Sequence, residues 1–178
     1  MIDNLCTHSS YSRKLLLESK MMYDRTTIEK SYSVLKEFYK VVENNEDKNV
    51  VQTLQFKLCN LKDINNTISR LASSAVIDDI ELFEVKNLAL LSADVKNILE
   101  KLNLDKVIEI PVLEDVVKIL DPDGLRIATF YIYDSYSEEL TSLRRSLKGK
   151  DFCQEEIYNK VSDIEDEIRT RLSEELKP

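Results

Sequence analysis

Residues able to carry out acid–base or nucleophilic chemistry are scarce in this chain. His8 is the single histidine, and it stands in a polar stretch of sequence. Histidine-based catalysis and His-x-x-x-His zinc binding need further imidazoles or acidic and nucleophilic partners around this one. We therefore expect His8 to be a surface or capping residue, and we expect no catalytic residue in this chain.

Phosphate-binding loops are excluded by the glycine content. Gly-x-x-x-x-Gly-Lys-Ser/Thr and Gly-x-Gly-x-x-Gly both need glycines at fixed spacing, so that backbone N–H groups can surround a phosphate. The chain has two glycines, Gly124 and Gly149, and neither motif can be written with them. We expect no nucleotide cofactor in this chain.

An acidic cluster near the C-terminus has the residue types that bind a metal ion. Basic residues follow it at helical spacing, as in Glu165 with Arg169 and Glu167 with Arg171. This pattern is typical of the solvated side of a helix, so we expect no metal site. The cluster comprises Asp163, Glu165, Asp166 and Glu167, among Lys160, Arg169 and Arg171.

Four aromatic side chains could stack on the bases of a nucleic acid. Only Arg126 and the pair Arg144 and Arg145 supply positive charge near them, so we favour core packing. The group comprises Phe130, Tyr131, Tyr133 and Tyr136.

Composition indicates an all-α protein. Two Gly and three Pro among 178 residues supply few turns, and 33% of the residues are charged. The net charge of -8 argues against a nucleic-acid surface spread over the whole chain. No apolar run approaches the ~20 residues that span a bilayer, so we expect no membrane partner. The three cysteines lack Cys-x-x-Cys spacing, and we interpret them as buried free thiols of a cytoplasmic protein.

Apolar periodicity predicts a helical core over residues 1–120. Thr26 and Glu29 have capping-box spacing, and Pro111 can begin a helix at its first turn. The predicted helices cover about 11–22, 26–42, 50–58, 61–72, 80–102 and 111–120.

A short extended hinge should follow over residues 121–137. The sequence Asp-Pro-Asp-Gly at 121–124 is typical of a turn, and residues 127–133 are β-branched and aromatic. The hinge residues that we single out are Asp121, Pro122, Gly124, Asp134 and Tyr136.

The last predicted element is one long helix over residues 138–178. Residues 140–147 and 157–172 carry two narrow apolar seams. One glycine inside a helix costs only ~1 kcal/mol, so we expect the helix to continue through Gly149 as an arm of roughly 60 Å. An arm of that length has to pack its apolar seam against another part of a protein.

The start of this arm resembles a segment of the MutS family of DNA mismatch-repair ATPases, Asp-Gly-Tyr-Asn-x-Glu-Leu-Asp-x-Leu-Arg. Ser135, Ser137 and Thr141 differ from that segment. The matching positions are Asp134, Tyr136, Glu139, Leu140, Leu143 and Arg144.

Other stretches are similar to the same family in the same order. Residues 7–16 resemble its Thr-x-x-x-x-Gly-x-Arg-Leu-Leu, with Ser12 and Lys14 in place of Gly and Arg. Residues 61–72 resemble its Leu-x-Asp-Ile/Leu-x-Arg-x-x-x-Arg-Leu-Ala segment. The turn at 121–124 and the ending at 169–176 look closer to the second bacterial branch, which lacks mismatch-reading domains.

The resemblance implies a non-catalytic core and lever segment of a DNA repair ATPase. The lever would start at Glu139, Leu140, Leu143 and Arg144, and it would couple the nucleotide state to a DNA clamp. ATP and Mg would bind the parent protein outside this segment, DNA would bind through the parent's clamp, and the parent would be a homodimer. No binding residue of the family falls on a position of this chain.

A second interpretation, of another class, is a free-standing helical adaptor. Its arm would form a coiled coil with a partner or with a second copy. An enzyme comes third, because the chain has so few groups for acid–base or covalent chemistry.

Overall fold

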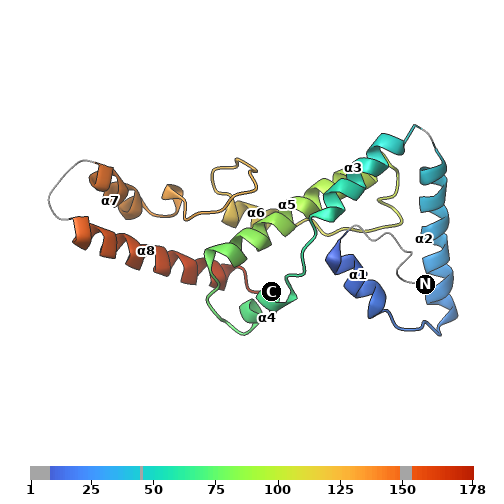
Figure 1. Ribbon diagram of the computed structural model, residues 1–178, viewed down its shortest axis with the longest axis horizontal. Helices are drawn as coiled ribbons and strands as arrows, with labels where there is room; N and C mark the ends of the chain where they lie inside the picture. The colour runs from blue at the N-terminus through green and yellow to red at the C-terminus, as the bar shows by residue number, and fades with distance from the viewer. Residues whose placement is uncertain (1–8, 45, 149–153) are drawn as a thin grey trace. The chain divides into compact units, whose positions relative to one another are not determined.

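The computed structural model describes residues 9–44, 46–148 and 154–178 of the chain (Figure 1). Its helices account for the secondary structure, and no strand occurs among the described residues, which confirms the all-α prediction. The helices are α1 (Ser10–Leu17), α2 (Arg25–Glu43), α3 (Lys48–Cys59), α4 (Asn65–Ala72), α5 (Asp79–Lys101), α6 (Glu114–Leu120), α7 (Glu138–Lys148) and α8 (Gln154–Glu175), with a 3-10 turn, η2 (Asp134–Tyr136), before α7.

Helix α2 begins earlier than its predicted capping box. Asp24 is the N-cap, and its carboxylate accepts a hydrogen bond from the backbone N–H of Thr27 at 2.8 Å. Hydrogen bonds from Thr26 and Thr27 lower the pKa of Asp24 to about 2. Glu29 instead pairs with Arg25 at 2.7 Å. The predicted box of Thr26 and Glu29 is therefore wrong, because the preceding aspartate already caps the free amides.

Three other predicted helices are longer than the observed ones. Helix α1 ends at Leu17, where the Ser19 hydroxyl donates to the carbonyl of Leu16 at 2.7 Å. Helix α4 begins only at Asn65, and α6 begins at Glu114 instead of Pro111. The carbonyl of Pro111 accepts a hydrogen bond from Ser92 of α5, so it is used outside a helix.

The chain divides into two compact units. The N-terminal unit comprises residues 1–63 and 90–113, and the C-terminal unit comprises residues 64–89 and 114–178. Helix α5 contributes its first part to the C-terminal unit and its remainder to the N-terminal unit. Each unit has its own buried apolar cluster.

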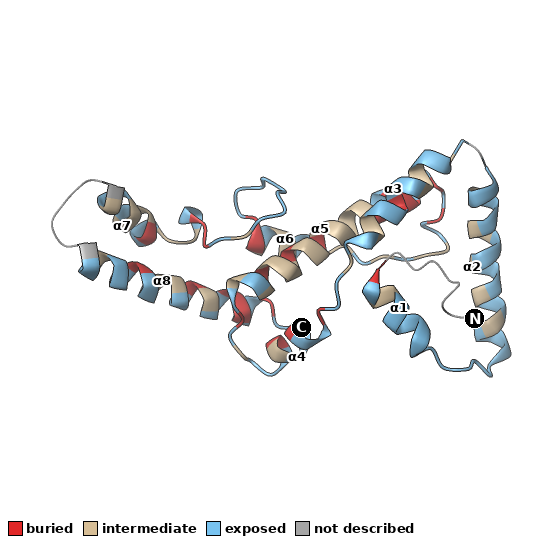
Figure 2. Cartoon of the chain, in the orientation of Figure 1, coloured by how far each residue is buried: buried red, intermediate tan, exposed pale blue. Residues whose placement is uncertain are grey.

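The core of the N-terminal unit forms where α2, α3 and the second part of α5 meet. Phe38 and Val41 of α2 are half-buried against this core. Much of α2 nevertheless remains exposed, as its pale colour in Figure 2 shows. The buried members are Leu54, Val95, Ile98, Leu99, Leu102 and Leu104.

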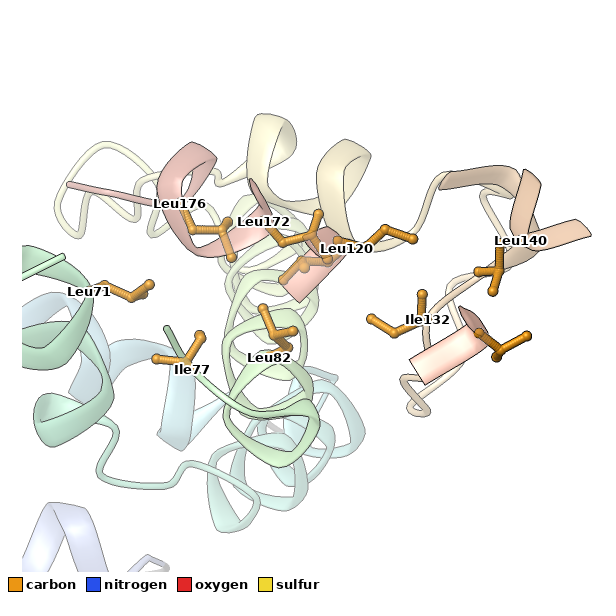
Figure 3. Packing of buried hydrophobic residues seen from close by; sticks show 10 residues of the cluster. Leu71, Ile77, Leu82, Leu120, Ile132, Leu140, Leu172 and Leu176 are labelled. Carbon is orange, nitrogen blue, oxygen red and sulfur yellow. The ribbon is translucent and has the colours of Figure 1, made fainter. Parts of the chain in front are cut away.

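The core of the C-terminal unit gathers side chains from α4, α5, α6, α7 and α8 (Figure 3). Ile132, in the connection between α6 and α7, is buried in the same cluster. The buried members are Leu71, Ile77, Leu82, Leu120, Ile132, Leu140, Val161, Ile168, Leu172 and Leu176.

The predicted arm of residues 138–178 is two helices, not one protruding rod. Arg144 of α7 donates to Glu165 of α8 at 2.8 Å. In one straight helix, 21 positions would separate these residues by roughly 30 Å. Residues 149–153, through which the helix was predicted to continue, lie outside the described part of the chain. The two apolar seams pack together and into the core, because that removes both from water.

Two further predictions concern exposure. Cys59 is exposed, so the expectation of a buried thiol is wrong for this residue, while Cys6 and Cys153 lie outside the described residues. His8 lies outside them as well. Among the helices that the structure describes, none combines the length and the hydrophobicity needed to cross a membrane.

Candidate functional site: the joint between α6 and α7

The most distinctive site is a fully buried lysine in the C-terminal unit. Lys86 of α5 has no solvent exposure, although it carries a charged ammonium group. Its Nζ donates to Asp121 Oδ1 at 3.0 Å, to the Thr129 carbonyl at 3.1 Å and to the Tyr133 hydroxyl at 2.8 Å. An ammonium has three donors, and all three are used here. Lys86 therefore ties one helix to both ends of the segment 121–133.

Asp121 is the anionic partner and also shapes the turn. Its Oδ2 accepts the backbone N–H of Arg126 at 2.6 Å, and its carbonyl accepts the N–H of Gly124 at 2.9 Å. Burial raises the pKa of Asp121, but the hydrogen bonds from Lys86 and from Arg126 lower it, and the net shift is downward. Asp121 thus stays ionised opposite the ammonium of Lys86.

The turn holds two residues in the left-handed region of backbone conformation. Gly124 has φ of 66°, which glycine adopts without cost. Arg126 has φ of 51°, which a residue with a Cβ rarely adopts. The Asp121 carboxylate holds the N–H of Arg126 in this conformation. The carboxylate that pairs with Lys86 therefore also fixes the conformation of the turn.

Two tyrosines, Tyr133 and Tyr136, hold the connection between this turn and α7 in place. Tyr133 is 1% exposed, and its ring lies 5.8 Å from the ring of Tyr136, edge to face. The Tyr136 hydroxyl donates to the carbonyl of Ile119 at 2.7 Å, at the end of α6. Burial is the main cause that raises the pKa of Tyr136, and the electrostatic effect of Tyr133 raises it further. The Tyr136 hydroxyl therefore keeps its proton and remains a donor. The predicted core packing of Tyr133 is confirmed, whereas Tyr131 is 52% exposed.

Arg144 connects the end of this segment with α8. Its guanidinium donates to the carbonyl of Ile132 at 2.8 Å, to the carboxylate of Asp134 and to Glu165 at 2.8 Å. Burial lowers the pKa of Arg144, but the hydrogen bonds to Glu165 and Asp134 raise it, and the net shift is upward. A planar guanidinium suits this three-way contact better than an ammonium would. We call residues 121–137, with Lys86 and Arg144, the joint.

The charged centre of the joint is closed to solvent and fully hydrogen-bonded within the protein. Lys86 has no exposed surface through which a substrate could reach it, and its protons are all donated to protein oxygens. No buried side-chain polar atom of the described residues is left without a partner. A fully satisfied polar network of this kind fixes one arrangement of the elements that it joins.

Comparisons of the chain with known proteins found no match. No family model, curated protein or solved structure matches the chain.

The structure brings most of the predicted hinge and lever-start residues together. Asp134 pairs with Arg144, and Tyr136 anchors to α6. Leu140 is fully buried and Leu143 packs beside the same cluster, whereas Glu139 is exposed. Of the turn residues, Asp121 is buried, while Pro122 and Gly124 are exposed.

Sequence reasoning missed Lys86, the centre of the network. A signal was present, because Lys86 follows Leu82 by four positions and precedes Ala89 by three. It therefore occupies the apolar stripe of α5, where Leu82 and Ala89 are fully buried. A lysine in such a position requires a buried acceptor elsewhere in the chain.

Three members of the acidic cluster, Asp163, Asp166 and Glu167, lie on the exposed side of α8, while Glu165 is half-buried. An open hollow of about 680 Å³ is lined there by Asp163, Asp166, Glu167, Thr170, Arg171 and Glu174. Arg169 bonds to Asp166 at 2.7 Å and approaches Glu165 to 3.7 Å, and Arg171 approaches Glu175 to 3.8 Å. Among the described residues, no three His, Cys, Asp or Glu side chains are grouped so as to hold a metal ion.

Proposed function

We propose that this chain is a non-catalytic core segment of a MutS-like DNA repair ATPase. The observation that carries the proposal is the convergence of the residues that match the family. Asp134, Tyr136, Leu140, Leu143 and Arg144 all take part in the joint or in the core beside it. These residues stand close together in the sequence, so what supports the proposal is that Tyr136 also contacts the end of α6 and that Arg144 also contacts α8.

Mechanically, the joint suits a segment that passes movement between helices. It binds α5, α6, α7 and α8 through the contacts of Lys86, Tyr136 and Arg144. Between them runs a connection without regular structure, with two left-handed residues. Because the joint fixes these helices in one arrangement, a movement of one helix would displace the others with it. In the parent protein, nucleotide state would reach the DNA clamp through such movements.

The charge of the segment is consistent with binding of DNA by other parts of the parent protein. The net charge of -8 does not favour direct contact with DNA phosphates. ATP, Mg and DNA would then all be bound by other parts of the parent protein, which we expect to be a cytoplasmic homodimer.

The adaptor interpretation relied on a C-terminal arm as the interaction surface. Ile168 and Leu172 of that arm are buried within the C-terminal unit, and Ile164 packs beside them. Their seam is occupied by the chain's own core, so we do not propose a coiled coil there.

The first test is the coding sequence that follows Pro178. A Gly-x-x-x-x-Gly-Lys-Ser/Thr segment further along the same reading frame is expected, and a stop codon directly after Pro178 would contradict the proposal. The second test uses the chain itself. Calorimetry with Mg-ATP and anisotropy with a labelled DNA duplex should show no binding of ATP and little of DNA, and micromolar ATP binding would contradict the proposal.

The longer protein allows a sharper test of the joint. Arg144→Met should uncouple ATP binding from DNA retention while leaving ATP affinity unchanged. Arg145→Met is the matched control, since Arg145 is an exposed neighbour on the same helix. Equal effects of both substitutions on DNA retention would contradict a role of the joint in coupling.

A further inference from the structure

No further inference is drawn: the strongest candidate, the exposed apolar face of helix α2 formed by Tyr32, Leu35, Tyr39 and Val42, carries none, because nothing in the described part of the chain shows what covers it.

Discussion

Replacing Lys86 by methionine tests whether the buried ion pair holds the joint together. Methionine keeps the length and the apolar stem of lysine but removes the ammonium. Three oxygens then lose the hydrogen bond from Lys86, namely Asp121 Oδ1, the Thr129 carbonyl and the Tyr133 hydroxyl. The Asp121 carboxylate, whose side chain has no solvent exposure, loses its counter-charge.

The expected cost follows from that unpaired carboxylate. Removing one partner of a buried ion pair destabilises a protein by about 3–5 kcal/mol, because the remaining charge is buried without compensation. Asp121 keeps the hydrogen bond from Arg126 at 2.6 Å, which moderates the penalty. We therefore expect the free energy of unfolding to fall by about 3 kcal/mol at pH 7. Asp121→Asn should cost a similar amount, and the double variant should cost less than the sum of both.

The effect of pH has a definite sign. In the wild-type chain the pKa of Asp121 is lowered, so the pair stabilises the fold above the ordinary carboxyl pKa of about 3.9 and loses that effect as the pH falls below it. Without Lys86, burial raises the pKa of Asp121, and the variant regains stability as the pH falls and the carboxyl takes up a proton. The difference between the two proteins should therefore shrink from pH 7 to pH 4.5.

The assay is urea unfolding followed by far-UV circular dichroism, since the chain has no tryptophan. Hydrogen exchange of the amides of residues 123–133 localises the effect to the C-terminal unit. Lys118→Met is the matched control, because Lys118 is an exposed lysine paired with Asp115 at 3.0 Å. A loss below about 1 kcal/mol for Lys86→Met, or a loss that is equal at both pH values, would refute this account of the pair.

Three further substitutions test the rest of the joint, each by urea unfolding against wild type. Arg144→Met removes charge-assisted hydrogen bonds to Asp134 and Glu165 and should cost about 2 kcal/mol, whereas an effect no larger than that of Arg145→Met would contradict the bridging role. Tyr136→Phe removes the hydrogen bond to the Ile119 carbonyl and should cost about 1 kcal/mol, and unchanged stability would show that water replaces it. Gly124→Ala should cost about 1 kcal/mol from the left-handed backbone alone, since an added Cβ meets no atom within 4 Å; a gain in stability would mean that the turn can relax.

Local patterns in the sequence predicted the local structure well. The helix predicted at residues 80–102 is α5, because its apolar residues recur at helical spacing over six turns. The Asp-Pro-Asp-Gly turn forms at its predicted place because Gly124 supplies the left-handed conformation. Errors gathered at helix ends, where one earlier aspartate, Asp24, decides the boundary of α2.

The candidate site could be predicted only in part. Asp121, Tyr136 and Arg144 were visible because turn chemistry and the family resemblance mark them. Lys86 was not, since its acceptors come from positions 35 to 47 residues further along the chain. A single sequence gives no information on which distant carboxylate will face a lysine in an apolar stripe.

The error over the C-terminal arm has the same origin. Periodicity revealed two narrow apolar seams, one before Gly149 and one after it, and each is compatible with a helix. It cannot tell whether such seams face a missing partner or each other. A rod would leave both seams in water, whereas the observed pair buries Leu140 of one and Ile168 of the other in a shared core. Continuity through one glycine depends on ~1 kcal/mol, while burial of two leucine or isoleucine side chains alone is worth several. Tertiary packing therefore decides the fold of this region, and Arg144 with Glu165 fixes its register.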